Sequence, residues 1–396
     1  MGDVSSATSM WGSSGLAYLT GPPDGPPDFS RANVLTHARR VAAAVAERWG
    51  ITVDAAGLLA GRAALLGLTR GGRVSAGGAT RLLAAADGWC AITLSRPDDA
   101  AAVPALVQTD EIACDPWPAL RHWATTQPVR AIVERATLLD IPAAGLGEAT
   151  AAAPRTRPWG GRGPARAAAG LLVADLSSMW AGPLCGQLLA RAGATVVKVE
   201  SPRRPDGTRG GNPAFFDWMN GQKLSYCVDF DAQAAELREL LTAADVVIEG
   251  SRPAALTRRR LGPDDLSPGR GRIWLRITGY TDGRPAFGDD AAVGGGLVGV
   301  AADGPVFCGD AIADPLTGLE AARAVAESLG RGGGELVEVS MAAVAAGYAA
   351  LPTQASLSDL PAPPPRVPPP GRPAARLGAD NRAVRAMVYE RGCAPC

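Results

Sequence analysis

Histidine and lysine are the scarcest residues of this 396-residue chain, which has only His37, His122, Lys198 and Lys223. Nucleophilic catalysis of the Ser–His–Asp or Cys–His kind needs a base next to the nucleophile. Both histidines lie in the first half of the sequence, and His37 falls within an apolar helical stretch. We interpret both as structural or surface residues and expect no catalysis of that kind.

Long apolar runs and a dense set of cysteines are also absent. No stretch approaches the roughly 20 apolar residues of a membrane span, and the start of the chain lacks the basic and apolar regions of a secretory signal. The seven cysteines are sparse and odd in number, which is typical of reduced intracellular thiols. Cys393 and Cys396 have redox spacing but no second pair, so no metal site is expected. We expect a cytoplasmic protein that binds no membrane.

Neither an excess of positive charge nor a phosphate-binding loop is present. Lys and Arg total 39, as do Asp and Glu, which argues against a nucleic-acid partner. Neither lysine stands in a G-x-x-x-x-G-K-[ST] motif. Gly294, Gly296 and Gly299 spell G-x-G-x-x-G, but a dinucleotide fingerprint follows the first strand of a βαβ unit. The turn after that strand, 177–183, lacks the three glycines, so NAD binding is not favoured.

The second part of the chain alternates short apolar runs with helical segments. Strands are predicted at 171–175, 195–200, 246–249, 273–277 and 335–339, and helices at 183–192, 231–244, 254–261 and 316–329. Such alternation is typical of βαβ units. It predicts an α/β fold with a Rossmann-like, doubly wound parallel sheet.

The first part of the chain predicts a smaller α+β domain. Residues 1–30 look loop-like, and the predicted elements are helices at 34–49 and 51–70, a strand at 89–94 and a helix capped by Asp98. The segment 361–373 is rich in proline and predicts an extended tether, followed by a helix at 380–390. The chain therefore divides into 1–150, a Pro/Gly/Arg-rich linker at 151–169, the α/β domain at 170–350, and 351–396.

Two stretches of the sequence echo each other. Ser14-Gly15-Leu16 and Asp24-Gly25-Pro26 match Gly295-Gly296-Leu297 and Asp303-Gly304-Pro305, and 44–47 repeats the sequence AVAE of 324–327. The shared order and nearly constant offset favour a degenerate internal repeat.

Asp314 is the candidate nucleophile. It stands in the sequence DPLTG, where a helix is predicted to begin. Asp at the N-cap followed by Pro is a favoured helix start that needs no catalysis, so the structural and catalytic interpretations both remain open. The N–H groups of a helix N-terminus also stabilise an anion. In the first copy of the repeat, Val34 or Leu35 falls at this position, and neither can act as a carboxylate.

Four separated motifs carry a family resemblance. They are LLVADLSSMWAGPLCGQLLARAGATVVKVE from 171, FFDWMNGQKLSY from 215, ADVVIEGSRPAAL from 244, and the Asp314-x-x-Thr317-Gly318 turn. In this order they resemble family III CoA-transferases of the CaiB/BaiF type over about 170–345. The resemblance implies that Asp314 is the nucleophile in a transferase of acyl-CoA metabolism.

The resemblance also implies substrates and partners. CoA would pass between an acyl-CoA and a free carboxylic acid through an aspartyl-acyl anhydride and an aspartyl-CoA thioester. CoA would be a co-substrate, with no tightly bound cofactor. The CoA contacts that the resemblance implies are Lys223, Arg252, Arg209, Ala181 and Gly182. The family implies a homodimer, interlocked or not, or a pairing with a family paralogue.

The order of the parts departs from the family pattern, because the small-domain-like part here precedes the Rossmann-like part. The resemblance implies that the glycine-rich segment 75–80 takes the place of the family's glycine loop over the active site. The rearrangement leaves a non-catalytic or partner-dependent subunit as an alternative. A second alternative, an acyl-CoA racemase or isomerase, would use a His before the Asp. Residues 271–313 contain no histidine, and Gly288 stands near its place, which disfavours isomerisation.

Overall fold

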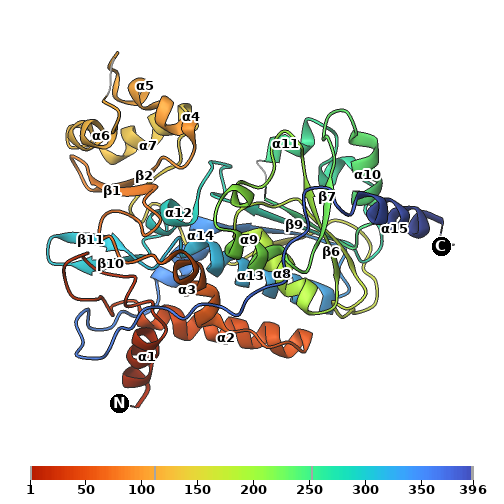
Figure 1. Ribbon diagram of the computed structural model, residues 1–396, viewed down its shortest axis with the longest axis horizontal. Coiled ribbons are helices and arrows are strands. Elements are labelled where there is room, and N and C mark those ends of the chain that lie inside the picture. The colour runs from red at the N-terminus through yellow and green to blue at the C-terminus, as the bar shows by residue number, and fades with distance from the viewer. Residues whose placement is uncertain (1, 111–112, 251–252, 394–396) are drawn as a thin grey trace.

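The computed structural model describes residues 2–110, 113–250 and 253–393 (Figure 1). Its main sheet has seven strands in the order β4-β12-β9-β8-β5-β6-β7, and only β4 runs antiparallel to its neighbour. The strands are β4 (Arg155–Pro158), β5 (Leu172–Asp175), β6 (Thr195–Glu200), β7 (Leu224–Cys227), β8 (Val246–Glu249), β9 (Ile273–Thr278) and β12 (Glu335–Ser340). The predicted parallel α/β sheet is confirmed.

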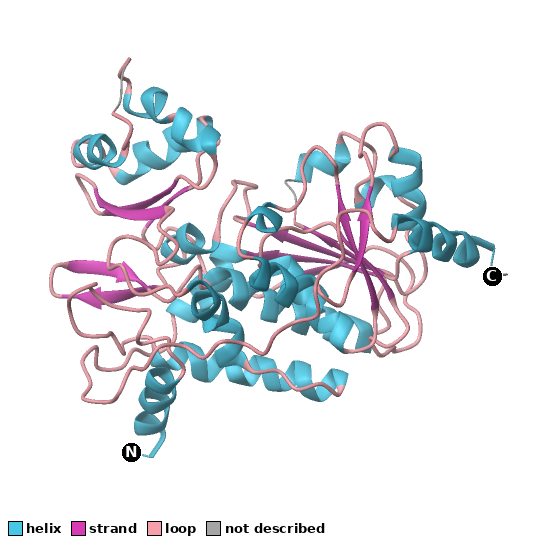
Figure 2. Cartoon of the chain, viewed as in Figure 1, coloured by secondary structure: helices cyan, strands magenta, loops and turns pink. Residues whose placement is uncertain are grey.

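Helices cover both faces of this sheet (Figure 2). Successive strand residues point to opposite faces, so Val173 joins one core with helices α8 (Ala181–Arg191) and α13 (Ala313–Gly330). Its neighbours Leu172 and Ala174 join the other core. That second core contains residues of α10 (Ala234–Ala243), α11 (Pro253–Thr257) and α15 (Asn381–Cys393). The sheet is therefore doubly wound.

A three-stranded antiparallel sheet forms the smaller domain with its own core. Its strands are β1 (Thr80–Ala84), β2 (Trp89–Thr93) and β3 (Ala143–Gly145), and its helices are α4 (Pro97–Ala101), α5 (Val103–Val107), α6 (Trp117–Ala124) and α7 (Val129–Leu138). The predicted cap at Asp98 is wrong. Arg96 is the N-cap of α4, and its backbone N–H donates to Asp99 Oδ2 at 2.8 Å.

The segment predicted as a loop at 1–30 contains a helix, α1 (Gly2–Ser13), which buries Trp11 completely. The remaining helices are α2 (Ala32–Trp49), α3 (Ala55–Leu66), α9 (Pro213–Asn220), α12 (Gly288–Gly294) and α14 (Met341–Ala349), with short 3₁₀ turns at Gly207–Gly210 and Pro263–Asp265. The hairpin β10 (Val298–Ala301) and β11 (Gly304–Phe307) completes the fold. The linker at 151–169 supplies strand β4 to the edge of the main sheet.

The two echoing sequence stretches form the same kind of unit. In each, a helix is followed by a connection of equal length, 14–31 or 295–312, and then by a helix of 18 residues, α2 or α13. Gly15 and Gly296 stand at matching places with φ of 87° and 77°. α2 packs directly against α13. When the helix starts are matched, Asn33 stands where the second unit has Asp314, which corrects the expected Val34 or Leu35.

The proline-rich segment 361–373 contains no helix or strand, and it lies against the body of the protein. A Cβ on Gly15 would meet Pro365 at 2.4 Å, and one on Gly221 would meet the Arg372 carbonyl at 1.9 Å. Beyond it, Asn381 exchanges two hydrogen bonds with the Cys227 backbone, at 2.9 and 2.8 Å. The segment thus connects the first part of the chain to the β7 edge of the sheet (Figure 1).

Candidate active site

The site begins where the chain leaves β5 and enters α8. β5 and β8 are adjacent strands, and the chain continues from β5 to β6 toward one edge of the sheet and from β8 to β9 toward the other. α/β folds bind ligands at such a point, outside the carboxyl ends of the two strands. A Cβ on Gly182 would lie 2.2 Å from Ser177 Oγ, and one on Gly250 would lie 3.0 Å from Ser177 Cβ. Glycine at both positions allows α8 to begin close to the sheet. The predicted CoA-contact residues Ala181 and Gly182 thus form the first turn of α8.

Asp314 lies against this turn, because its carboxyl accepts a hydrogen bond from the Ala181 backbone N–H. Asp314 is the second residue of α13, and Ile312 occupies the N-cap with no side-chain cap bond. The interpretation of Asp314 as an N-cap is therefore wrong. Burial raises the pKa of Asp314 to about 7, with Arg62 opposing the shift and the Asp289 and Asp310 carboxylates adding to it. Near neutral pH this side chain holds or releases a proton readily.

Gly288, the first residue of α12, has no side chain that would overlap the Asp314 carboxyl. A Cβ on Gly288 would lie 2.3 Å from Asp314 Oδ2 and 2.3 Å from the Ala311 carbonyl oxygen. Ala311 itself has φ of +42°, in the left-handed region that alanine seldom adopts. A residue in this conformation costs conformational free energy, which the surrounding structure must offset. Such residues are concentrated at functional sites.

Three charged side chains surround Asp314, and none of them was predicted from the sequence. Arg62 of α3 donates to Asp310 Oδ1 through Nη1 at 2.6 Å, and its guanidinium lies 5.7 Å from the ring centres of both Trp180 and Phe215. Asp289 of α12 accepts a hydrogen bond from the Ala311 N–H at 3.0 Å. Burial and the nearby Asp310 carboxylate raise the pKa of Asp289 to about 6.

The sequence did carry one signal for Arg62. It is the only charged residue in the twelve residues of α3, and a lone charge in an apolar helix usually has a buried partner. Asp289 and Asp310 gave no such signal, because their proximity depends on the tertiary fold.

The glycine-rich turn at 75–80 lies beside this cluster. Ser75 hydrogen-bonds to the Asp289 carboxyl through its side chain, and a Cβ on Gly77 would lie 3.6 Å from Arg62 Nη2. The structure therefore places the segment at the site, while its role as a loop over the substrate stays a prediction.

Lys223 lies in the protein interior. Its side chain is 1% exposed, and Nζ donates to Asp175 Oδ2 at 2.8 Å and to the Pro183 carbonyl at 2.9 Å. An ammonium held in this way has no access to a phosphate of CoA. Lys223 instead joins the end of β5 to the first turn of α8, so its predicted contact with CoA does not fit this structure.

Arg209 also binds a side chain of the protein itself. It forms a two-pronged ion pair with Glu200, with its shortest distance 2.6 Å, and lies over the Phe216 ring at 4.4 Å. Arg252 lies outside the described residues. The structure thus brings Ala181 and Gly182 to Asp314 but not Lys223 or Arg209.

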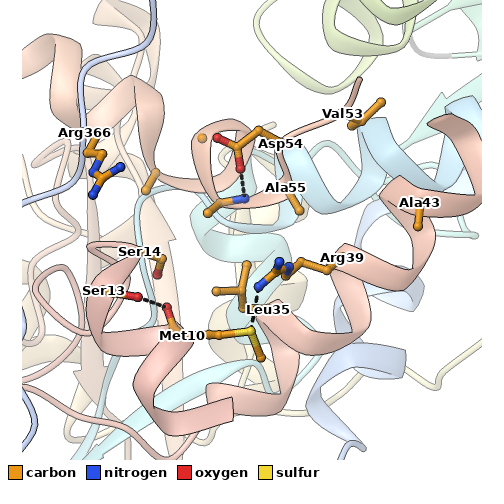
Figure 3. Close-up of a pocket in the computed structure, with 13 residues that line it drawn as sticks. Met10, Ser13, Ser14, Leu35, Arg39, Ala43, Val53, Asp54, Ala55 and Arg366 are labelled. Carbon is orange, nitrogen blue, oxygen red and sulfur yellow. Dashed lines mark hydrogen bonds between the residues drawn. The ribbon is translucent and has the colours of Figure 1, made fainter. Parts of the chain in front are cut away.

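A cavity lies elsewhere in the described chain, between α1, α2 and the start of α3 (Figure 3). It measures about 490 Å³, and its rim carries Arg39, Asp54 and, from the proline-rich segment, Arg366. Neither Asp314 nor any of the three charged residues around it lines this cavity. Among the described residues, no helix is both long and apolar enough to cross a bilayer.

The family model of CoA-transferase family III matches residues 169–369, a little over half of the chain. The chain belongs to CoA-transferase family III. The family match begins where the linker ends and includes Asp314, whereas the first 168 residues lie outside it.

The family III chain is similar to several curated transferases. It is 37% identical over 133 residues to a probable fatty acyl-CoA transferase of Mycobacterium tuberculosis, covering 31% of this chain and 34% of that protein. It is 35% identical over 170 residues to the beta subunit of a succinyl-CoA–L-malate CoA-transferase of Chloroflexus aurantiacus, covering 38% and 42%. The chain thus spans well under half the length of these relatives.

Among solved structures, a CaiB/BaiF family protein of Brucella suis is 30% identical to the family III chain and has a TM-score of 0.42. The superposition covers 46% of this chain and 55% of that one.

Proposed function

We propose that this family III chain transfers CoA between an acyl-CoA and a free carboxylic acid, with Asp314 as the covalent nucleophile. The observation that carries the proposal is the placement of Asp314 at the start of two helices. Its carboxyl accepts the Ala181 N–H at the start of α8 and lies in the first turn of α13. Backbone N–H groups at helix starts suit a site where negative charge develops.

The proposed reaction conserves the Asp314 carboxylate. A carboxylate oxygen attacks the thioester carbonyl, the C–S bond breaks, and CoA leaves as the thiolate with the acyl group held as a mixed anhydride. The thiolate then attacks the Asp314 carbonyl, which releases the first acid and leaves an aspartyl-CoA thioester. The acceptor carboxylate attacks that thioester, which expels the thiolate and forms a second mixed anhydride. The thiolate then attacks the acceptor's acyl carbon and releases the Asp314 carboxylate. Covalent catalysis of this kind divides one difficult exchange into easier steps.

Gly288 favours transfer over isomerisation. The isomerase hypothesis requires a histidine near this position, and even a Cβ there would lie 2.3 Å from Asp314 Oδ2. The Asp314 carboxyl can therefore keep its position only while residue 288 has no side chain.

Mass spectrometry of the intact protein tests the proposal. The protein is mixed with a panel of acyl-CoAs, the adduct is trapped with hydroxylamine, and modified residues are mapped. We expect an acyl adduct or a hydroxamate at Asp314, absent from Asp314→Asn. Because the carboxylate is the attacking form and its pKa is raised to about 7, adduct formation should rise with pH through about 7.

Asp54→Asn is the matched control for this experiment. Asp54 caps α3 by accepting the Ala56 N–H at 3.1 Å, and Asn caps helices as well as Asp does. The control should form the adduct as the wild type does. A folded wild-type protein that forms no adduct with any donor would overturn the proposal and favour a non-catalytic or partner-dependent subunit.

A further inference from the structure

The first part of the chain, which lies outside the family match, contributes to the site at Asp314. Arg62 comes from α3, and Ser75 comes from the glycine-rich turn. Asp314, Asp289 and Asp310 come from the second part. The cluster therefore contains one cation from one part of the chain and three carboxyls from the other.

Arg62 is fixed within this cluster by aromatic rings on one side and by an ion pair on the other. Its guanidinium lies over Trp180, the residue directly before Ala181, and over Phe215, each at 5.7 Å. Trp180 and Phe215 in turn contact each other edge to face at 5.5 Å between ring centres. The ion pair with Asp310 at 2.6 Å anchors the other side. A partly buried cation held in this way changes the energy of neighbouring carboxylates more than a fully solvated one does.

We infer that Arg62 is the positioning residue that favours the ionised form of Asp314, in which it attacks. The inference rests on the proposed function, because only there does an ionised Asp314 attack a substrate. The titration that tests it does not depend on that function. Arg62 is the one cation among the described groups that act most strongly on Asp314, which are Arg62, Asp289, Asp310 and the Ala181 N–H. The two carboxylates favour a proton on Asp314, and Arg62 and the amide oppose it.

The signs of these interactions predict opposite effects for two variants. Arg62→Gln removes the cation, so Asp314 should ionise at a pH about one unit higher. Asp310→Asn removes a neighbouring negative charge and frees Arg62, so Asp314 should ionise at a lower pH. A general loosening of the site by both variants would shift the two titrations in the same direction, because added water stabilises the carboxylate in either case.

The test is a titration by ¹³C NMR of protein labelled at the aspartate carboxyls, with the Asp314 signal assigned by its loss in Asp314→Asn. Arg96→Gln is the matched control. Its ion pair with Asp99, at 2.5 Å and with side-chain exposures of 30% and 3%, resembles that of Arg62 and Asp310, at 2.6 Å with 24% and 0%. The control should leave the Asp314 titration unchanged.

The rate of adduct formation supplies a second readout where the proposed function holds. At pH 7, Arg62→Gln should slow acylation of Asp314 about five-fold, and raising the pH should restore the rate. If acylation is absent in the wild type, the proposed function fails while the NMR titration still decides the role of Arg62. An Asp314 titration that is the same in wild type, Arg62→Gln and Asp310→Asn overturns the inference.

Discussion

At the scale of single residues, the site depends on the absence of a side chain at Gly288 as much as on its charged residues. Asp314 was predicted from a short motif, because an aspartate at a helix start can be recognised locally. Arg62, Asp289 and Asp310 were not, because they come from separate elements that only the tertiary fold brings together. The importance of Gly288 also escaped local analysis, since it depends on the backbone conformation at Ala311.

Gly288→Ala should therefore reduce the acylation of Asp314 more than it reduces the stability of the fold. The added methyl must displace the Asp314 carboxyl or the Ala311 carbonyl, each 2.3 Å away. A displacement of about 1 Å can cost on the order of 100-fold in rate, so we expect acylation of Asp314 to fall by at least ten-fold. Mass spectrometry of adduct formation measures it, with thermal melting to check that the variant folds.

Gly347→Ala is the control, because it is also helical and a Cβ there meets nothing within 4 Å. It should acylate normally. Wild-type acylation in folded Gly288→Ala would show that the carboxyl can move aside without loss of function.

At the scale of elements, the position of α8 depends on a buried ion pair. The apolar alternation predicted β5, α8 and β6 within a few residues, because short buried strands and the helices between them have strong local patterns. The family resemblance, in contrast, implied that Lys223 contacts CoA. A basic residue shows its charge in the sequence but not its partner, and here Asp175 lies 48 positions away.

Lys223→Met distinguishes these two roles. Removing one partner leaves the Asp175 carboxylate buried and unpaired, so we expect a loss of about 3–5 kcal/mol in the free energy of unfolding. Denaturant unfolding measures this loss. Adding Asp175→Asn to Lys223→Met should recover part of it, since the uncompensated charge is then removed. Unchanged stability with weaker CoA binding would instead support the contact between Lys223 and CoA.

At the scale of the whole molecule, the two parts of the chain share one hydrophobic core. Leu16, Val34 and Leu59 from the first part join the same cluster as Leu184 and Leu316 from the second. The sequence predicted the two parts and the boundary between them, but it contained no information on how they pack. The unexpected helix α1 illustrates this limit, because its polar sequence buries Trp11 only against other parts of the chain.

A chain cut between the two parts should therefore stay together. Residues 151–153 are exposed, so a protease site placed between Ala152 and Ala153 should be cleaved in the folded protein. We expect the cleaved protein to elute as one species in gel filtration and to melt in a single transition only a few degrees lower. Separation of the two fragments under native conditions would contradict a shared core.

The proline-rich segment sets an order of events during synthesis. Gly12 and Gly15 lie against Pro361 and Pro365, which are translated much later than they are. Domains fold as they are made, beginning with the N-terminal part. The surface around α1 must therefore stay uncovered until residues 361–365 have been translated. A nascent chain that pauses before residue 361 exposes this surface, and chaperones are suited to protect it during that interval.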